Sequence, residues 1–145
     1  MNKTLKICTL GDTTLPEYAT AGSAGLDLTA DIKTELTIQP GETVLLPSGI
    51  KLEIPEEHVG LMYPRSSLGT KQGLILANTV GVIDSDYRGE VKIPLKNTSA
   101  IPQIIAPKQR IAQLIIQPYA KCNIELVKEV GSSERGEGGF GSTGR

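Results

Sequence analysis

The stretch GVIDSDYRGE, residues 81–90, holds the side chains best suited to acid–base chemistry. Two aspartates stand two positions apart directly after an apolar pair, so Asp84 falls where a predicted strand gives way to a turn. A carboxylate at such a boundary can face a cleft, hold a water molecule and remove its proton. The alternative is an ordinary turn, in which Asp86 caps its own backbone and Tyr87 packs at the hairpin.

The stretch PRSSLGTKQGL, residues 64–74, has the composition of an anion-binding segment. Arg65 can donate two parallel hydrogen bonds to phosphate oxygens, and Ser66, Ser67 and free N–H groups at a predicted helix start add further donors. The same letters also fit a capped turn that carries a solvated arginine.

Four more polar residues call for a role. The Asn78 side chain offers one acceptor and two donors, which match the imide edge of uracil, although an isolated Asn is also common in turns. Asp27 follows the glycine-rich AGSAGL and is a candidate partner for a divalent cation. Gln113 interrupts an apolar strand and needs a partner if it points inward. His58, the sole histidine, lies in a polar loop, so we expect no histidine-based triad.

The tail RGEGGFGSTGR, residues 135–145, holds five glycines and the only phenylalanine of the chain. Glycines cannot build a core around Phe140, so we expect its ring to serve something outside the domain. A glycine-rich backbone can wrap an anion, and an aromatic ring offers a flat face for a base. The tail therefore indicates a lid for a nucleotide; the alternative is a disordered terminus.

The elements that must position these residues are short strands. Sixteen glycines and nine prolines recur between apolar runs of period two, and no segment sustains a period of 3.6. The pattern predicts an all-β sandwich or jelly roll with one short helix at residues 66–72, N-capped by Ser66 or Ser67. The predicted strands are residues 43–46, 49–54, 59–63, 74–76, 90–95, 110–117 and 124–127.

The predicted core consists of Ile, Leu and Val, because the chain has no Trp, one Phe and four Tyr. The continuous apolar run at residues 114–116 indicates a strand covered on both faces. Self-association of the chain would supply the second cover.

The length, net charge and cysteine content of the chain limit the class of protein. With 145 residues the chain fits one domain, and its net charge of −1 argues against a general nucleic-acid coat, so any nucleotide should bind at a local site. Cys8 and Cys122 have no zinc-ligand spacing and indicate free thiols in a reducing compartment. The sequence shows no signal peptide and no apolar run of about 20 residues, so we expect a soluble, cytoplasmic protein without membrane contact.

Five segments together resemble the trimeric dUTPase family over essentially the whole chain. In chain order they are AGSAGLDLTA, PRSSLG, NTVGVIDSDYRGE, RIAQL and RGEGGFGSTG. The resemblance implies a jelly-roll homotrimer with active sites shared between subunits. It also implies Mg²⁺-dependent hydrolysis of dUTP to dUMP and pyrophosphate, which limits uracil in DNA and supplies dUMP for dTMP synthesis.

The resemblance also assigns roles residue by residue. Asp84 is similar to the general base for the water that attacks the α-phosphorus, and Tyr87 to the residue that packs beneath the deoxyribose and excludes a 2′-hydroxyl. The uracil reader corresponds to Asn78, Val82, Ile83 and Lys92.

The remaining assignments concern the phosphates, the metal and the lid. The phosphate cradle corresponds to Arg65, Ser66, Ser67 and Gln113, and Asp27 to a water-mediated partner of Mg²⁺. Residues 1–131 would form the domain and residues 132–145 a flexible arm. Its lid residues would be Arg135, Phe140, Gly141, Ser142 and Thr143, with Phe140 over the uracil.

One departure and two alternatives accompany this resemblance. At residues 107–110 the chain reads PKQR, where the family more often has Gly and an acidic residue before the arginine. A dCTP deaminase has the same fold and also carries PRSSL, but the IDSDYRGE hairpin and the GGFGSTG tail favour the dUTPase. A jelly-roll module that binds single-stranded RNA through its tail is the alternative from another class.

Overall fold

The computed structural model describes residues 3–139, which form short strands and one helix. The strands are β1 (Lys6–Thr9), β2 (Leu26–Thr29), β3 (Leu36–Ile38), β4 (Thr43–Glu53), β5 (His58–Pro64), β6 (Leu74–Leu76), β7 (Gly81–Ile83), β8 (Glu90–Asn97), β9 (Gln103–Ile105) and β10 (Arg110–Pro118). The helix is α1 (Ser66–Gln72). It is far too short to cross a membrane, and the described part of the chain contains no other helix.

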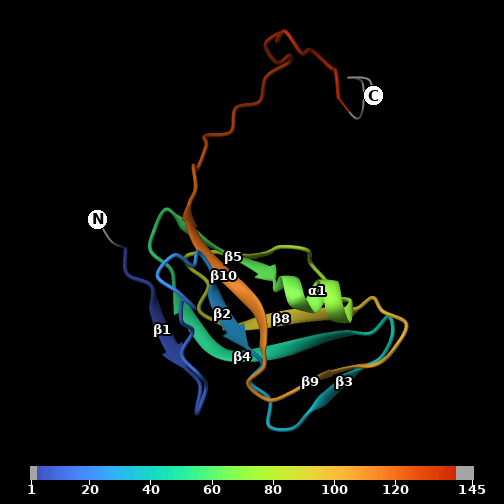
Figure 1. Cartoon of the computed structure of the whole chain (residues 1–145). Coiled ribbons are helices and arrows are strands. Elements are labelled where there is room, and N and C mark those ends of the chain that lie inside the picture. Colours follow the sequence, from blue (N-terminus) through green and yellow to red (C-terminus); the bar gives the residue numbers. More distant parts are fainter. Residues whose placement is uncertain (1–2, 140–145) are drawn as a thin grey trace.

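Two four-stranded antiparallel sheets make up the body, and a two-stranded ribbon lies at one end (Figure 1). The strand order is β1-β4-β8-β6 in one sheet and β2-β10-β5-β7 in the other, while β3 pairs with β9. Neighbouring strands in a sheet are thus far apart in the sequence. This arrangement confirms the predicted all-β sandwich with a single short helix.

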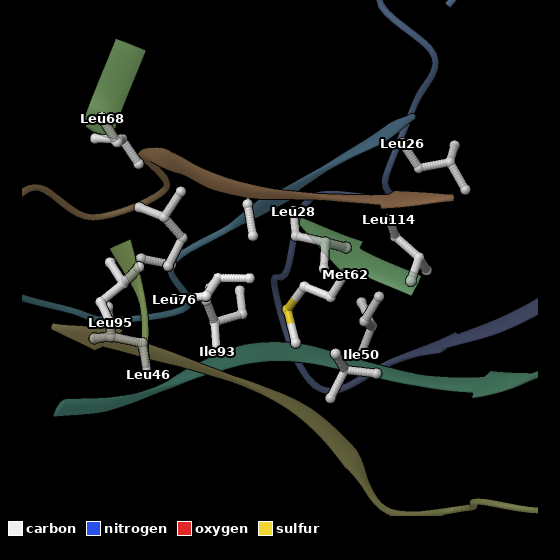
Figure 2. Packing of buried hydrophobic residues seen from close by; sticks show 14 of the residues in the cluster. Leu26, Leu28, Leu46, Ile50, Met62, Leu68, Leu76, Ile93, Leu95 and Leu114 are labelled. Atoms are coloured by element: carbon white, nitrogen blue, oxygen red, sulfur yellow. The ribbon is translucent and has the colours of Figure 1, made fainter. Parts of the chain in front are cut away.

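The core fills the space between the two sheets (Figure 2). Strand β8 shows how the sequence directs the core: Val91, Ile93 and Leu95 point inward and are buried, while Lys92 and Lys96 at alternate positions are exposed. The period of two therefore sorts side chains between core and solvent. The buried hydrophobic residues are Leu, Ile, Val, Ala and Met, which confirms the predicted aliphatic core.

Strand β5 is central to the sheet that carries most of the chemistry. It pairs with β10 on one side and with β7 on the other, both antiparallel. In this register Gly60 lies opposite Ile83, and Tyr63 lies opposite Gln113. The two ends of β5 therefore carry different polar groups, as described below.

The helix has the predicted bounds but a different start. Arg65, in extended conformation, is the N-cap residue and makes no side-chain capping bond. The prediction that Ser66 or Ser67 caps the helix is therefore wrong, because the helix begins at Ser66 itself. Both hydroxyls are consequently free of a capping role.

The predicted strand at residues 124–127 is absent from the structure. Ile124 is 99% exposed and Leu126 98% exposed, and residues 117–138 are exposed throughout. The chain leaves the two sheets after β10 and runs away from them (Figure 1). A strand needs a partner for its N–H and C=O groups, and the described part of this single chain offers none there.

The apolar run at residues 114–116 is covered on one face only. Leu114 is buried in the core, whereas Ile115 and Ile116 are half-buried. The prediction of cover on both faces is therefore not met within one chain.

The PKQR turn at residues 107–110 is closed by backbone and side-chain hydrogen bonds. Lys108 adopts a left-handed backbone with φ of 59°, and its N–H donates to the carbonyl of Ala30. The Gln109 side chain accepts the N–H of Ala106 at 2.9 Å, a bond that a carboxylate could also accept. The geometry therefore favours Gly at residue 108 and a side-chain acceptor at residue 109, and this chain has a lysine and a neutral acceptor there.

We expect Lys108→Gly to raise the free energy of unfolding by about 0.5–1 kcal/mol. A left-handed backbone costs an L-residue roughly 1–2 kcal/mol, which Gly does not pay. Part of this stabilisation is offset by the greater conformational freedom of Gly in the unfolded chain. Urea unfolding of the purified protein measures the difference. Lys108→Ala is the matched control and should give no gain, since Ala keeps the Cβ; equal stabilisation by both variants would contradict the explanation.

Candidate active site

One pocket gathers the predicted base and the predicted uracil-binding residues. It has a volume of about 340 Å³ and lies between β7, the following turn and the outer face of the β4–β8 pair. Its lining includes six predicted site residues, namely Asn78, Val82, Ile83, Asp84, Tyr87 and Lys92. The residues that the resemblance assigned to the base, the uracil reader and the sugar therefore border one pocket.

The alternation of β7 directs Asp84 into this pocket. Gly81 and Ile83 point inward and are buried, while Val82 is 65% exposed and faces outward. Asp84 is the next residue on the outward face and is exposed at the mouth of the pocket. The strand ends at Ile83, so the carboxylate stands at the boundary between strand and turn.

The turn after Asp84 is closed by the backbone. The N–H of Tyr87 donates to the Asp84 carbonyl at 3.2 Å, and the Arg88 guanidinium donates to the Ser85 carbonyl at 2.7 Å. Among the described contacts no side-chain bond from Asp86 contributes to it. The Asp84 carboxylate thus remains available to a ligand or water.

A second pocket gathers the predicted phosphate-binding residues. It has a volume of about 320 Å³ and lies where β5 ends, beside β2 and β10. Its lining includes Asp27, Arg65, Ser66, Ser67 and Gln113, together with Gly25 and neighbouring residues of the AGSAG segment. Asp27 and Gln113, which are 86 positions apart in the sequence, are brought together here by strand pairing.

Asp27 organises the positive charge of this second pocket. Its Oδ1 lies 3.1 Å from Nε of Arg65 and its Oδ2 lies 3.0 Å from Nη1 of Arg110. One carboxylate between two guanidinium groups leaves a formal charge of +1, which favours an anion. Because Arg65 uses Nε for Asp27, its terminal nitrogens remain able to bind phosphate oxygens.

Gln113 has the partner that an inward polar side chain requires. Its Nε2 donates to the Pro64 carbonyl at 3.1 Å, which ties β10 to the end of β5. On the other side lies Gly25, where a Cβ would come within 2.8 Å of Oε1 of Gln113. The glycine therefore leaves room for the amide, whose oxygen faces the pocket region.

The two pockets share no lining residue, and Asp84 and Arg65 lie beside opposite ends of β5. Asp84 follows Ile83, which is paired with Gly60, whereas Arg65 directly follows the last residue of the strand. The five residues from Gly60 to Arg65 span about 16 Å of extended chain. The base and the phosphate cradle of one chain are thus separated by far more than a hydrogen bond.

The predicted lid is placed only in part. Arg135 is exposed in the extended segment beyond β10, with its Nε 2.6 Å from the Gly138 carbonyl, and it lines neither pocket. Phe140, Gly141, Ser142 and Thr143 lie outside the described residues.

Sequence reasoning missed several lining residues. Leu45, Met62 and Glu90 border the first pocket, and Ser23 and Gly25 border the second. Glu90 stood inside a recognised motif and could have been included. Leu45 and Met62 are brought in by strand register, which the sequence pattern does not reveal.

The donor set of the second pocket suits a metal that arrives with its ligand. Within residues 3–139 no three His, Cys, Asp or Glu side chains lie close enough to form a metal cage. Asp27 is the one carboxylate of the second pocket, and both of its oxygens already contact arginines. Mg²⁺ commonly binds through one or two carboxylates plus substrate phosphates and keeps several waters, so these residues fit an outer-sphere role.

A family model described as dUTPase matches residues 12–144, which includes both pockets. The chain belongs to the dUTPase family. A deoxyuridine 5′-triphosphate nucleotidohydrolase of Alcanivorax borkumensis is 49% identical over 138 residues, covering 94% of this chain and 92% of that protein. The corresponding protein of Neisseria meningitidis serogroup A is 49% identical over 131 residues, covering 90% and 87%.

Solved dUTPases share the fold as well. The dUTPase of Staphylococcus bacteriophage 80alpha, determined with dUPNHPP, superimposes with a TM-score of 0.86 at 28% identity, covering 99% of this chain and all of that one. The sandwich described above is therefore the jelly roll of the dUTPases. The family is generally Mg²⁺-dependent, which agrees with a site that offers no metal cage of its own.

We expect Arg65→Lys to weaken binding of pyrophosphate, used as an anion probe, about tenfold. Lysine keeps the charge but lacks the planar fork that lets Arg65 contact Asp27 through Nε and an anion through its terminal nitrogens. One charged hydrogen bond is worth about 1.5–3 kcal/mol. Isothermal titration calorimetry measures the change. Lys121→Arg, in the exposed segment after β10, is the control for a distant cation swap. Unchanged affinity in Arg65→Lys would show that charge alone matters.

Proposed function

We propose that Asp84 and the two pockets carry out the reaction of this dUTPase, the hydrolysis of dUTP to dUMP and pyrophosphate. The observation that carries the assignment is the grouping of an exposed carboxylate with Asn78 and Tyr87 in one pocket, and of the cationic cradle in another. The first set suits a nucleoside and the second suits its phosphates.

In this proposal Asp84 is the general base. Its carboxylate takes a proton from a water molecule as the water oxygen bonds to the α-phosphorus. The bond from that phosphorus to the bridging oxygen then breaks, and pyrophosphate leaves with the bonding electrons. Positioning and charge stabilisation account for most catalysis of phosphoryl transfer, so one base and a ring of donors suffice.

Recognition of uracil would rest on the Asn78 amide and the backbone of β7. Uracil presents a donor at N3 flanked by two carbonyl acceptors, which a carboxamide and backbone groups can match. Cytosine would place an amino group against donors and leave buried polar groups unpaired, a mismatch that can be worth 10⁴-fold or more. The close approach of the hairpin would exclude the thymine methyl group.

Selection of the sugar would rest on Tyr87. Tyr87 lines the first pocket and is 47% exposed, so a ligand in the pocket can contact it. A flat ring against the deoxyribose leaves no room for a 2′-hydroxyl group. This role requires the ring to be held in a fixed place.

The phosphates would lie against Arg65, Ser66, Ser67 and Gln113, with Mg²⁺ held mainly by the triphosphate and touched by Asp27 through water. When bound, Mg²⁺ would neutralise charge that develops on the phosphate oxygens. The protein residues supply the rest: Arg65 donates to phosphate oxygens while Asp27 holds its Nε, and the hydroxyls of Ser66 and Ser67 add donors free of any capping role.

A homotrimer with shared sites would resolve the separation between the two pockets. A general base must lie within about one water of the atom that its water attacks, so a gap of about 16 Å within one chain is too long. A neighbouring copy can instead bring its cradle to the first pocket of this chain. Closed cyclic symmetry then repeats the same contact at every interface.

The exposed segment beyond β10 also supports assembly. Its predicted strand at residues 124–127 has no partner within the described chain, and Ile124 and Leu126 are almost fully exposed. Apolar residues on an unpaired strand favour pairing with another chain. Residues 132–145 would then act as the active-site arm, with residues 1–131 as the domain.

The two alternative functions have less support. The curated relatives are dUTP nucleotidohydrolases over most of both chains, which favours pyrophosphate release over deamination of dCTP. The net charge of −1 does not favour an RNA-binding module, because such modules carry an excess of positive charge.

We expect Asp84→Asn to lower kcat at least 100-fold with little change in affinity for dUPNHPP. The amide keeps the shape of the side chain but cannot accept the proton of the water, and general bases contribute typically 10²–10⁴-fold. Pyrophosphate release and calorimetric titration measure the two quantities. The matched control is Asp86→Asn, the same change two residues along and outside the pocket lining. Near-normal turnover in Asp84→Asn would remove Asp84 from the proposed role.

Mixed assemblies test the shared site. Asp84→Asn and Arg65→Ala chains are each expected to be nearly inactive alone. Co-refolded at equal amounts, they should recover about a quarter of wild-type turnover, since about one site in four combines an intact base with an intact cradle. Sedimentation should give three chains per particle. No recovery in particles shown to contain both variants would mean that each chain builds its own site.

A further inference from the structure

The ring of Tyr87 lies directly over Gly89, two residues along the same turn. A Cβ added to Gly89 would come within 2.6 Å of Cζ and 3.0 Å of Cε2 of Tyr87, and closer still to its Oη. Real Cβ atoms do not approach other heavy atoms so closely, because packing distances for carbon are about 3.5–4 Å. The absence of a side chain at residue 89 thus determines where the ring can lie.

Gly89 is not needed here for its backbone angles. Its φ lies outside the left-handed region, in contrast to Gly49 and Gly73. Alanine could therefore adopt the same backbone. What the glycine supplies is the space that the phenol occupies.

A hydrogen bond holds the ring in that space. Oη of Tyr87 donates to the Glu90 carbonyl at 3.0 Å. The Glu90 carboxylate in turn accepts the N–H of Gly49 at 3.0 Å, at the point where the β4–β8 register shifts between Pro47 and Lys51. The position of the Tyr87 ring is therefore fixed by contacts to the sheet and not only by the turn.

We propose that Gly89 is a positioning residue that determines the selection of deoxyribose over ribose by fixing the Tyr87 ring. The inference rests on the proposed function, in which Tyr87 packs beneath the sugar, and it extends that function to a residue that touches no substrate. A ring displaced by a methyl group no longer closes the space that a 2′-hydroxyl group would enter.

The turn can accept alanine at residue 89 without unfolding. Tyr87 is 47% exposed, so its ring can swing toward solvent, and the contacts that would be lost lie outside the core. A substitution should therefore change selectivity far more than stability.

The test compares kcat/KM for dUTP and for UTP in four variants of the full chain. They are Gly89→Ala, Tyr87→Phe, the double variant, and Gly69→Ala as a matched control in α1, where a Cβ meets only the Leu74 carbonyl at 3.9 Å. The ratio of the two kcat/KM values should fall at least tenfold in Gly89→Ala and about threefold in Tyr87→Phe, and stay unchanged in Gly69→Ala. Calorimetric affinities for dUMP and UMP should shift in the same direction.

The double variant decides whether the two residues act together. If Gly89 acts through the anchored ring, the double variant should resemble Gly89→Ala alone, because the hydrogen bond is lost in both. Effects that multiply, or a Gly89→Ala ratio equal to that of wild type, would overturn the proposal. If Gly89→Ala does not fold, an unchanged ratio in Tyr87→Phe would overturn it instead.

The outcome for Gly89 is separable from that for the activity itself. A wild-type chain that does not hydrolyse dUTP would refute the proposed function without testing whether Gly89 positions the Tyr87 ring. If the wild-type chain hydrolyses dUTP and rejects UTP, and Gly89→Ala leaves this selectivity unaltered, only the positioning role of Gly89 is refuted.

Discussion

The antiparallel pairing of β5 with β7 and β10 is the constraint on which the site depends. It places Asp84 beside one end of β5, and Arg65 and Gln113 at the other. The backbone of β5 spans about 16 Å between the residue opposite Ile83 and Arg65. The same ladder buries Leu114 and Met62 in the core, so the separation cannot be closed by a local adjustment. The proposal that the active site is built from more than one chain rests on this separation.

The sequence predicted the local parts of this arrangement well. Apolar runs of period two identified five of the ten strands in the described part of the chain, namely β4 (as two segments), β5, β6, β8 and β10. The grouping of Asn78, Val82, Ile83 and Lys92 came from resemblance. The grouping of Asp27, Arg65 and Gln113 came from resemblance, since long-range register leaves no mark in periodicity. The helix cap failed because a serine is common both before and within a first turn. The strand at residues 124–127 failed because propensity cannot say whether a partner strand is present.

The two polar centres differ in how they are held. Asp27 is fixed by two arginines, and Gln113 by the Pro64 carbonyl, so the cradle is tied to three strands. The first pocket depends on the turn in which the Tyr87 ring lies over Gly89. This turn is held to β4 by hydrogen bonds from Tyr87 to Glu90 and from Gly49 to Glu90. In the proposed function, the recognition of charge and the recognition of the sugar would thus depend on separate supporting contacts. Variants can consequently alter one without the other.

The central claim is that base and cradle of one active site come from different chains. A crystal structure of the assembled protein with dUPNHPP and Mg²⁺ tests it most directly. We expect the Asp84 carboxylate to lie one water away from the α-phosphorus, and the phosphates to contact Arg65 and Ser66 of another copy. A nucleotide bound by Asp84 and Arg65 of the same chain would contradict it.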